Sequence, residues 1–266
     1  MLFSFCWLFL LTILGPHASE NVGTKIVTRQ SSPGGVSEET LYIIADRRRL
    51  EFRQSVQLEN NDGAPEVALE VFILRCDLGW NFHLLPKTEE FNSSPYPPRP
   101  STPEQAEQLG VEHPDRGKPA KLRIETTTVD TGERKEMFGY VARHVITTTK
   151  QIPLDEATSQ SSQLVTNGWY IDLDLSISCD PKPLPGTKRV GVLEFIDIGA
   201  RETGLPLKET KTFPMSTIFP DGTRKTYDSL LKIEVIVLER AALDPALFEV
   251  PSEYKLVEPS QRRLEE

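Results

Sequence analysis

The sequence predicts a mainly β protein of the α+β type, built on a curved antiparallel sheet or half-barrel with one or two short helices. Twenty-one prolines and sixteen glycines divide the chain into short segments, which favours β structure over a helical bundle. Residues 169–177 alternate apolar and polar side chains, as expected of a strand with one buried and one solvated face. The turn residues Thr131 and Gly132 lie between two β-rich runs and predict a hairpin.

The first 19 residues are typical of a secretory signal peptide. Residues 2–14 are almost wholly apolar and are followed by Gly15-Pro16 and by small residues. This run is shorter than the roughly 20 residues that a helix needs to cross a bilayer. An uncleaved N-terminal anchor is the alternative interpretation. We therefore expect an exported protein, periplasmic or extracellular, with no transmembrane segment after signal removal.

The mature chain is expected to form one domain. Residues 20–39 are polar and contain the Pro33-Gly34-Gly35 turn signal, which predicts a flexible lead. A single antiparallel β domain is expected over residues 40–258, and the charged residues 259–266 are expected to fray.

Strand patterns in the first half continue from residue 40 to about residue 92, with a hairpin at residues 77–79. Seven prolines then lie between residues 93 and 119, a density that no central strand accepts, so this segment is predicted to be an extended crossover. Within it, Thr102 as N-cap and Pro103 as first helical residue predict a short helix over 103–109.

Strand patterns resume after the crossover, and the chain ends in a second helical turn. Asp244 as N-cap predicts a single turn that places Leu247 and Phe248 against the core. The predicted strands of this half cover residues 121–129, 135–149, 169–177, 190–198, 207–213 and 230–238.

Composition and charge exclude several classes of protein. The chain has 30 Lys plus Arg against 39 Asp plus Glu, a net charge of −9, and no cluster of basic residues suited to a phosphate backbone, which argues against nucleic-acid binding. With 38% hydrophobic residues, the chain can bury a core, so wholesale disorder is excluded as well.

Two cysteines remain after cleavage of the predicted signal peptide, which contains Cys6. An exported protein with only Cys76 and Cys179 most simply pairs them in a disulfide. The alternative is two unrelated buried thiols, because sequence alone does not set the geometry.

Candidate polar sites are few. None of the four histidines has metal-ligand spacing, so we expect no metal and no cofactor. Arg143 and His144 are adjacent in a β-rich run, so one of them must face the core side, paired with a carboxylate or a carbonyl group. Asp172 and Asp174 share one strand face, either as a cation or acid–base site or simply as a solvated surface.

Several segments resemble exported bacterial proteins, acidobacterial in type, whose function is not established. This group is in turn distantly similar to the periplasmic outer-membrane lipoprotein-carrier fold, which implies a curved antiparallel sheet with an apolar concavity. The resemblance carries no catalytic residues. The segments that carry it are Arg75-Cys76-Asp77-Leu78-Gly79, Ser94-Pro95-Tyr96-Pro97-Pro98, Asp130-Thr131-Gly132-Glu133-Arg134, Gly139-Tyr140, Ala142-Arg143-His144-Val145-Ile146-Thr147-Thr148 and Asp244-Pro245-Ala246-Leu247-Phe248-Glu249-Val250-Pro251.

Three classes of function follow from these observations. The favoured class is a noncatalytic binding module for an apolar, lipid-like ligand or an envelope protein partner. An exported hydrolase acting on envelope or extracellular polymers is the second class, and a structural domain without a small ligand is the third. The absence of catalytic motifs and the fold analogy favour binding. The residues expected to line an apolar site are Trp169, Ile171, Leu173 and Leu175, and those expected to serve a hydrolase as acid and base are Asp172, Asp174, His83 and His144.

Overall fold

A computed structural model describes residues 22–56, 66–97, 121–154, 162–180, 189–190, 193–218 and 222–258. The predicted signal peptide, the helix over 103–109, most of the proline-rich crossover and the tail over 259–266 lie outside these residues. Within the described part of the chain, one 14-stranded sheet contains every strand. The strands are β1 (Val22–Ser32), β2 (Gly35–Ile44), β3 (Arg47–Val56), β4 (Glu66–Arg75), β5 (Trp80–Leu85), β6 (Glu90–Pro95), β7 (Leu122–Met137), β8 (Tyr140–Pro153), β9 (Ser162–Ile171), β10 (Arg189–Val190), β11 (Leu193–Ile198), β12 (Leu205–Ile218), β13 (Arg224–Ala242) and β14 (Lys255–Leu256).

The sheet is mainly antiparallel, with strand order β10-β11-β7-β8-β9-β12-β13-β1-β2-β3-β4-β5-β6-β14. The mainly β class is confirmed, but the expected antiparallel sheet is mixed near its two ends. There, β11 pairs with β7 and β14 pairs with β6 in parallel, because neither β11 nor β14 follows its partner through a hairpin. In the described residues, the only helical element is the 3₁₀-helix η1 (Pro245–Phe248).

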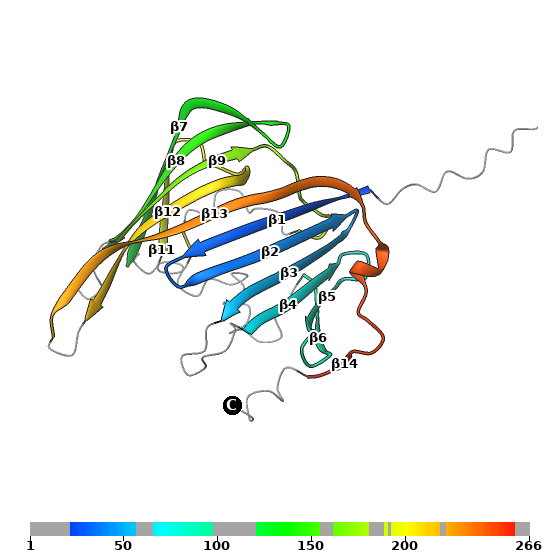
Figure 1. Cartoon of the computed structure of the whole chain (residues 1–266). Helices are drawn as coiled ribbons and strands as arrows, with labels where there is room; N and C mark the ends of the chain where they lie inside the picture. The colour runs from blue at the N-terminus through cyan, green and yellow to red at the C-terminus, as the bar shows by residue number, and fades with distance from the viewer. Residues whose placement is uncertain are drawn as a thin grey trace, which may run out of the picture.

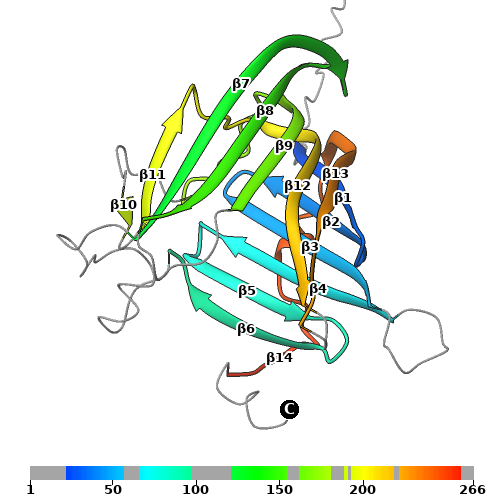
Figure 2. The same ribbon diagram turned by 90° about the vertical axis from the view of Figure 1, so that its left-hand side faces the viewer.

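The sheet curls into an open trough (Figures 1 and 2). One wall consists of β7, β8, β9, β11 and β12, and the other consists of β1 to β6. Between them runs β13, which at 19 residues is the longest of the described strands and pairs with β12 on one side and β1 on the other.

The predicted flexible lead is instead part of the centre of the sheet. Residues 22–39 belong to β1 and β2, which pair with each other around the turn at Pro33-Gly34. In β1, Ile26 and Val27 are both buried, although successive side chains of a strand point to opposite faces. The polar residues that argued against a strand are accommodated by cross-strand pairing, as when Arg29 lies opposite Glu38 with their side chains 3.5 Å apart.

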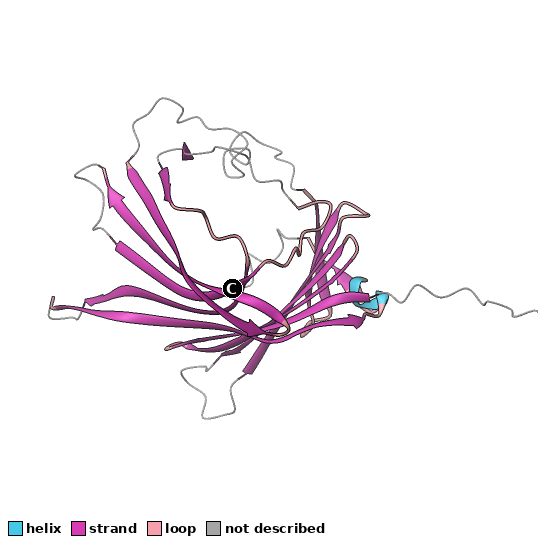
Figure 3. Cartoon of the chain, turned by 90° about the horizontal axis from the view of Figure 1, so that it is seen from above, coloured by secondary structure: helices cyan, strands magenta, loops and turns pink. Residues whose placement is uncertain are grey.

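Residues 172–180, which we call the strap, cross the concave face of the sheet after β9 ends at Ile171 (Figure 3). The sequence predicted a strand over 169–177, and this is wrong after Ile171. The alternation is real, because Ile177 is buried while Asp174 and Ser176 are exposed. An alternation of apolar and polar residues indicates an extended backbone with one buried side. Here the strap buries that side against the face of the sheet instead of pairing at its edge.

The first core cluster lies beneath the start of the strap. It is formed by Ile26, Ala142, Ile171, Leu207 and Val235. Leu173 and Leu175 of the strap pack against it, as does Trp169 of β9. The strap therefore closes the hydrophobic core on the concave side.

The second core cluster lies under the C-terminal segment, where η1 packs on the outer side of the wall formed by β2 to β6 (Figure 3). Phe248 is fully buried among Val71, Ile73 and Leu84. The side chain of Asp244 accepts a hydrogen bond from the backbone N–H of Ala246 at 2.9 Å. The predicted N-capped turn is thus confirmed in its position and its cap.

The β7–β8 hairpin turns at residues 138–139, and the predicted turn at Thr131-Gly132 is wrong. Residues 131–133 instead form an irregularity within β7, where the register shifts between Asp130 and Arg134. Gly132 has a φ of 82°, which suits glycine, and its N–H donates to Asp130 at 2.9 Å. Turn-type residues in this segment therefore serve a bulge, which bends the strand without ending it.

Candidate functional site

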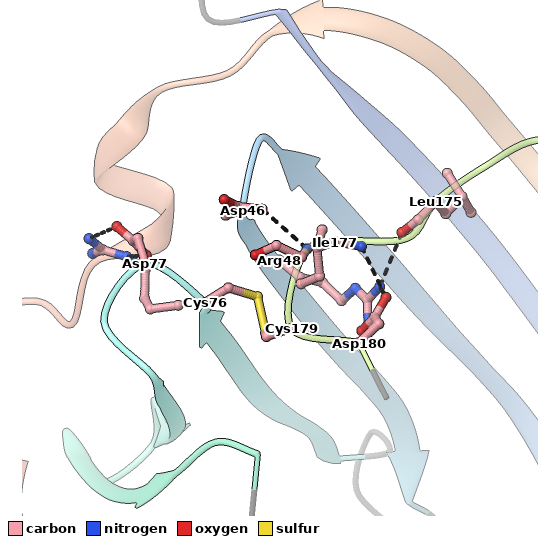
Figure 4. The surroundings of a disulfide bond; sticks show 10 residues. Asp46, Arg48, Cys76, Asp77, Leu175, Ile177, Cys179 and Asp180 are labelled. Atoms are coloured by element: carbon pink, nitrogen blue, oxygen red, sulfur yellow. Dashed lines mark hydrogen bonds and ion pairs between the residues drawn. A yellow bond between two sulfur atoms is a disulfide. The ribbon is translucent and has the colours of Figure 1, made fainter. Parts of the chain in front are cut away.

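The strap is anchored at its far end by the disulfide between Cys76 and Cys179, which confirms the predicted pairing. The two Cα atoms are 5.4 Å apart and the residues are separated by 103 positions in the sequence. Cys76 follows β4, so the bond joins the wall formed by β1 to β6 to a segment that started from the opposite wall (Figure 4).

Polar contacts reinforce this anchor (Figure 4). The guanidinium of Arg48 donates to both carboxylate oxygens of Asp180, at 3.0 and 2.6 Å, and to the carbonyl oxygen of Leu175 at 3.1 Å. The backbone N–H of Ser178 donates to Asp46 at 3.2 Å. These contacts fix the strap in a single path across the sheet.

The four apolar residues that the sequence assigned to a ligand site belong to the packed interior. Ile171 is 1% exposed, and Leu173 and Leu175 pack against the first core cluster. The ring of Trp169 stacks on His144 with centroids 4.9 Å apart. Of the four, Leu173 also lines a small pocket.

The polar residues predicted in the same region are only partly brought together. Arg143 pairs with Asp172 at 2.7 Å and with Glu202 at 2.5 Å. The expected carboxylate partner is thus found for Arg143, although His144 is the residue that stacks on Trp169 beside the first core cluster. The hydrogen bonds that Arg143 donates to Glu202, and then to Asp172, raise the pKa of Arg143 above its ordinary value. Asp174 instead accepts from the N–H and hydroxyl of Ser176, at 2.9 and 2.6 Å.

His144 and His83 take separate structural contacts. His144 lies 2.8 Å through Nε2 from the side-chain oxygen of Asn167 and 3.0 Å through Nδ1 from the hydroxyl of Thr131. His83, on the other wall, lies 3.2 Å from Glu70 and stacks on Phe72 with centroids 4.3 Å apart. No group of three or more potential metal ligands occurs among the described residues.

A groove that the sequence did not reveal runs along the wall formed by β7, β8, β9 and β12. It consists of two adjoining pockets of about 300 and 370 Å³ that share Leu164 and Lys211. We call it the threonine groove. Its lining residues are Thr126, Thr128, Thr147, Thr149, Gln151, Ser162, Gln163, Leu164, Thr166, Tyr170, Arg201, Glu202, Gly204, Pro206, Glu209, Lys211, Phe213 and Pro214.

The threonines form rows across the strands. Thr128 lies opposite Thr147, and Thr147 lies opposite Thr166 on β9. In the next row, the hydroxyls of Thr126 and Thr149 are 3.4 Å apart. Because side chains alternate along a strand, the intervening Thr127 and Thr148 point to the other face.

A buried tyrosine–glutamate pair lies at one end of the groove. The hydroxyl of Tyr170 donates to Glu209 at 2.5 Å, and the other carboxylate oxygen of Glu209 is 3.2 Å from Lys211. Burial, then the hydrogen bond to Glu209, raises the pKa of Tyr170 far above its ordinary value. The phenol therefore remains protonated and acts as a donor.

The carboxylate of Glu202 lies at the same end, in the crossover from β11 to β12. It accepts hydrogen bonds from Arg143 at 2.5 and 3.0 Å and from the N–H of Gly204 at 2.6 Å. Burial alone would raise the pKa of Glu202, but the hydrogen bonds from Arg143 and the backbone bring it below its ordinary value. Glu202 is thus held in its charged form.

Comparisons with known proteins add no assignment. No protein-family model and no curated protein sequence matches this chain. In the described residues, no helix is long and apolar enough to cross a membrane.

Two runs of three threonines, at 126–128 and 147–149, are the sequence signal that could have indicated the groove. Glu202 offered no such signal, because its partner Arg143 lies 59 positions away. Only the crossover between β11 and β12 brings the two together.

Proposed function

We propose that the chain is a noncatalytic binding module of an exported protein, and that its ligand lies in the threonine groove. The observation that carries this proposal is a row of threonine side chains from three adjacent strands, Thr128, Thr147 and Thr166, that lines one pocket of the groove. Hydroxyls both donate and accept hydrogen bonds, and a β-sheet holds them at fixed spacing. Such a surface is pre-organised for a polar ligand.

The dimensions of the groove favour an extended ligand. Along β9 it reaches from Tyr170 to Ser162, eight residue steps at about 3.3 Å each, or about 26 Å. The amides of Gln151 and Gln163 and the ring of Phe213 also line it. Hydroxyls, amides and an aromatic ring along an open channel suit an oligosaccharide chain. The sequence favoured an apolar, lipid-like ligand, whereas this lining supports a polar one.

Export is supported by the Cys76–Cys179 disulfide, since such bonds persist mainly in oxidising compartments. Together with the proposed signal peptide over residues 1–19, the disulfide supports a location in the periplasm or outside the cell. A glycan of the envelope or of the extracellular space is the corresponding ligand class.

The arrangement of the carboxylates favours binding over hydrolysis. A glycosidase needs one carboxyl group with a raised pKa as general acid. In the groove, Glu202 has a lowered pKa and is engaged by Arg143. Glu209 is engaged by Tyr170 and Lys211. The four acid and base candidates from the sequence, Asp172, Asp174, His83 and His144, line neither pocket of the groove.

Isothermal titration with hexasaccharides of glucose and of N-acetylglucosamine tests the proposal. The wild-type protein is expected to bind at least one of them, and the double variant Thr147→Val with Thr166→Val is expected to lose that binding, because the valines keep the shape and remove two hydroxyls. Thr127→Val with Thr148→Val changes the opposite face and serves as the matched control. If the wild-type protein binds palmitate but no saccharide, the apolar, lipid-like ligand becomes the favoured ligand class again.

A further inference from the structure

A second pocket, separate from the threonine groove, lies where the β7–β8 hairpin, the strap and β13 meet. We call it the rim pocket. It has a volume of about 170 Å³ and shares no lining residue with the groove. Its lining residues are Thr24, Phe138, Tyr140, Leu173, Leu238, Glu239 and Arg240.

One side of the rim pocket is formed by side chains that are firmly supported by the core. Tyr140, Leu173 and Leu238 all line it and all pack against the first core cluster. Its volume is close to the roughly 150 Å³ of an apolar cavity that binds benzene. By its size, the pocket can hold one aromatic ring, with Leu173 and Leu238 as apolar contacts and the charged residues at its rim.

Phe138 forms one side of this pocket in a strained backbone conformation. Its φ is 53° and that of the next residue, Gly139, is 77°. A two-residue hairpin turn with both φ values positive normally has Asn, Asp or Gly first, and a bulky residue there is an outlier. Phe138 is also 41% exposed, so burial does not offset the strain. An exposed aromatic ring at a strained turn indicates a role in binding.

The charged residues at the rim indicate which polar group a ligand of this pocket would carry. Glu239 is paired with Lys25 at 3.7 Å. Arg240 is exposed, and its side chain has no hydrogen bond or ion pair with any other described residue. Its guanidinium is therefore available to an anion, and the planar fork of arginine matches a carboxylate.

We propose that the rim pocket binds a small aromatic carboxylate, with the ring between Phe138 and Tyr140 and the carboxylate on Arg240. This site is independent of the saccharide groove. Ligands of this class include free aromatic acids and larger molecules that end in an aromatic carboxylate, and both present the same ring and the same carboxylate to the pocket.

Phenylacetate is the probe, and binding is measured by chemical shift perturbation and titration calorimetry with the full mature chain. Benzyl alcohol serves as its uncharged analogue. Wild-type protein is expected to bind phenylacetate at least about tenfold more tightly than benzyl alcohol. Arg240→Gln is expected to abolish that preference while benzyl alcohol still binds. A phenylacetate that carries a larger group on its ring, with the carboxylate free, distinguishes the two sources, because loss of affinity for this extended probe points to the free acid.

Phe138→Asn separates binding from folding. Asn tolerates positive φ, so this variant is expected to keep or raise the Tm while its affinity for phenylacetate falls about tenfold or more. Val141→Thr is the control, because Val141 lies on the same hairpin, is 71% exposed and does not line the pocket. No phenylacetate binding by the wild type, or a Phe138→Asn variant with a lower Tm and unchanged affinity, would overturn the proposal. Neither result alters saccharide binding in the groove.

Discussion

Tyr170 donates its phenolic hydrogen to Glu209 across the position of Gly168. The hydroxyl is 2.5 Å from the carboxylate oxygen, although the direct cross-strand partner of Glu209 is Gly168. The missing side chain of Gly168 provides the room, since a Cβ there would lie 2.7 to 2.9 Å from the Tyr170 ring. One end of the threonine groove therefore depends on a tyrosine that folds over a glycine to reach a buried carboxylate.

Tyr170→Phe is expected to lower the free energy of unfolding by about 1–3 kcal/mol, because it leaves a buried acceptor on Glu209 without its donor. Equilibrium urea denaturation measures this loss. Tyr227→Phe is the matched control, because Tyr227 is 47% exposed and its replacement is expected to change stability little. Equal effects of the two substitutions would show that the hydrogen bond from Tyr170 to Glu209 does not contribute to the free energy of unfolding.

Gly168→Ala tests the same arrangement from the other side. The added methyl group would meet the Tyr170 ring at less than the distance of ordinary van der Waals contact, so the ring must move away from Glu209. We expect reduced stability and an altered near-ultraviolet circular dichroism signal from the displaced ring. In the Tyr170→Leu background, the cost of Gly168→Ala is expected to shrink. An unchanged cost in that background would mean that the ring is not the obstacle.

Loss of the disulfide is expected to destabilise the fold and release the strap. Cys76 and Cys179 close a loop of 103 positions, and removing a native disulfide costs about 2–5 kcal/mol in the unfolding free energy. The double variant Cys76→Ser with Cys179→Ser, and wild-type protein under reductant, should show the same loss. Hydrogen exchange is expected to accelerate first at residues 172–180. Uniform acceleration over the whole sheet would argue against a locally anchored strap.

Several parts of this fold could be predicted because the decisive interactions are local. The cap of Asp244 on η1 involves residues two positions apart, and the strand pattern over 230–238 is confirmed within β13. The disulfide followed from counting cysteines in a chain with a predicted signal peptide, without any geometry. In each case the sequence pattern and the tertiary structure agree.

The missed elements depend on contacts between distant segments. β1 has too many polar residues for a strand pattern, yet it is buried between β13 and β2 because both neighbours supply cross-strand partners. The strap has an ideal strand pattern, yet it lies on the sheet because Arg48 and Cys76 hold its end. The threonine groove combines four strands and a crossover, and only the topology brings these together.

Acid destabilisation is expected to depend on Glu202. Its pKa in the folded protein is lower than its ordinary value of 4.5, so the unfolded chain binds more protons in this range. Its contribution to stability is therefore complete above about pH 4.5 and is lost as the pH falls through the lowered pKa. Asp77, whose pKa is lowered mainly by its hydrogen bond from Arg75, adds a loss of the same sign below its ordinary value of 3.8. Glu39 acts in the opposite direction, because burial raises its pKa and its effect on stability becomes unfavourable as the pH rises above 4.5.

Glu202→Gln is expected to lower stability at neutral pH and to flatten the fall in stability at acidic pH, because the group that titrates there has been removed and Arg143 has lost its buried partner. Urea denaturation at a series of pH values measures both effects. Glu136→Gln is the control, because Glu136 is exposed. Asp77 still titrates in the Glu202→Gln variant, so its acid response should shrink without disappearing. A variant with the same slope as the wild type below pH 4.5 would show that Glu202 has no lowered pKa. The Arg143–Glu202 pair would then contribute no pH-dependent stability to the end of the groove.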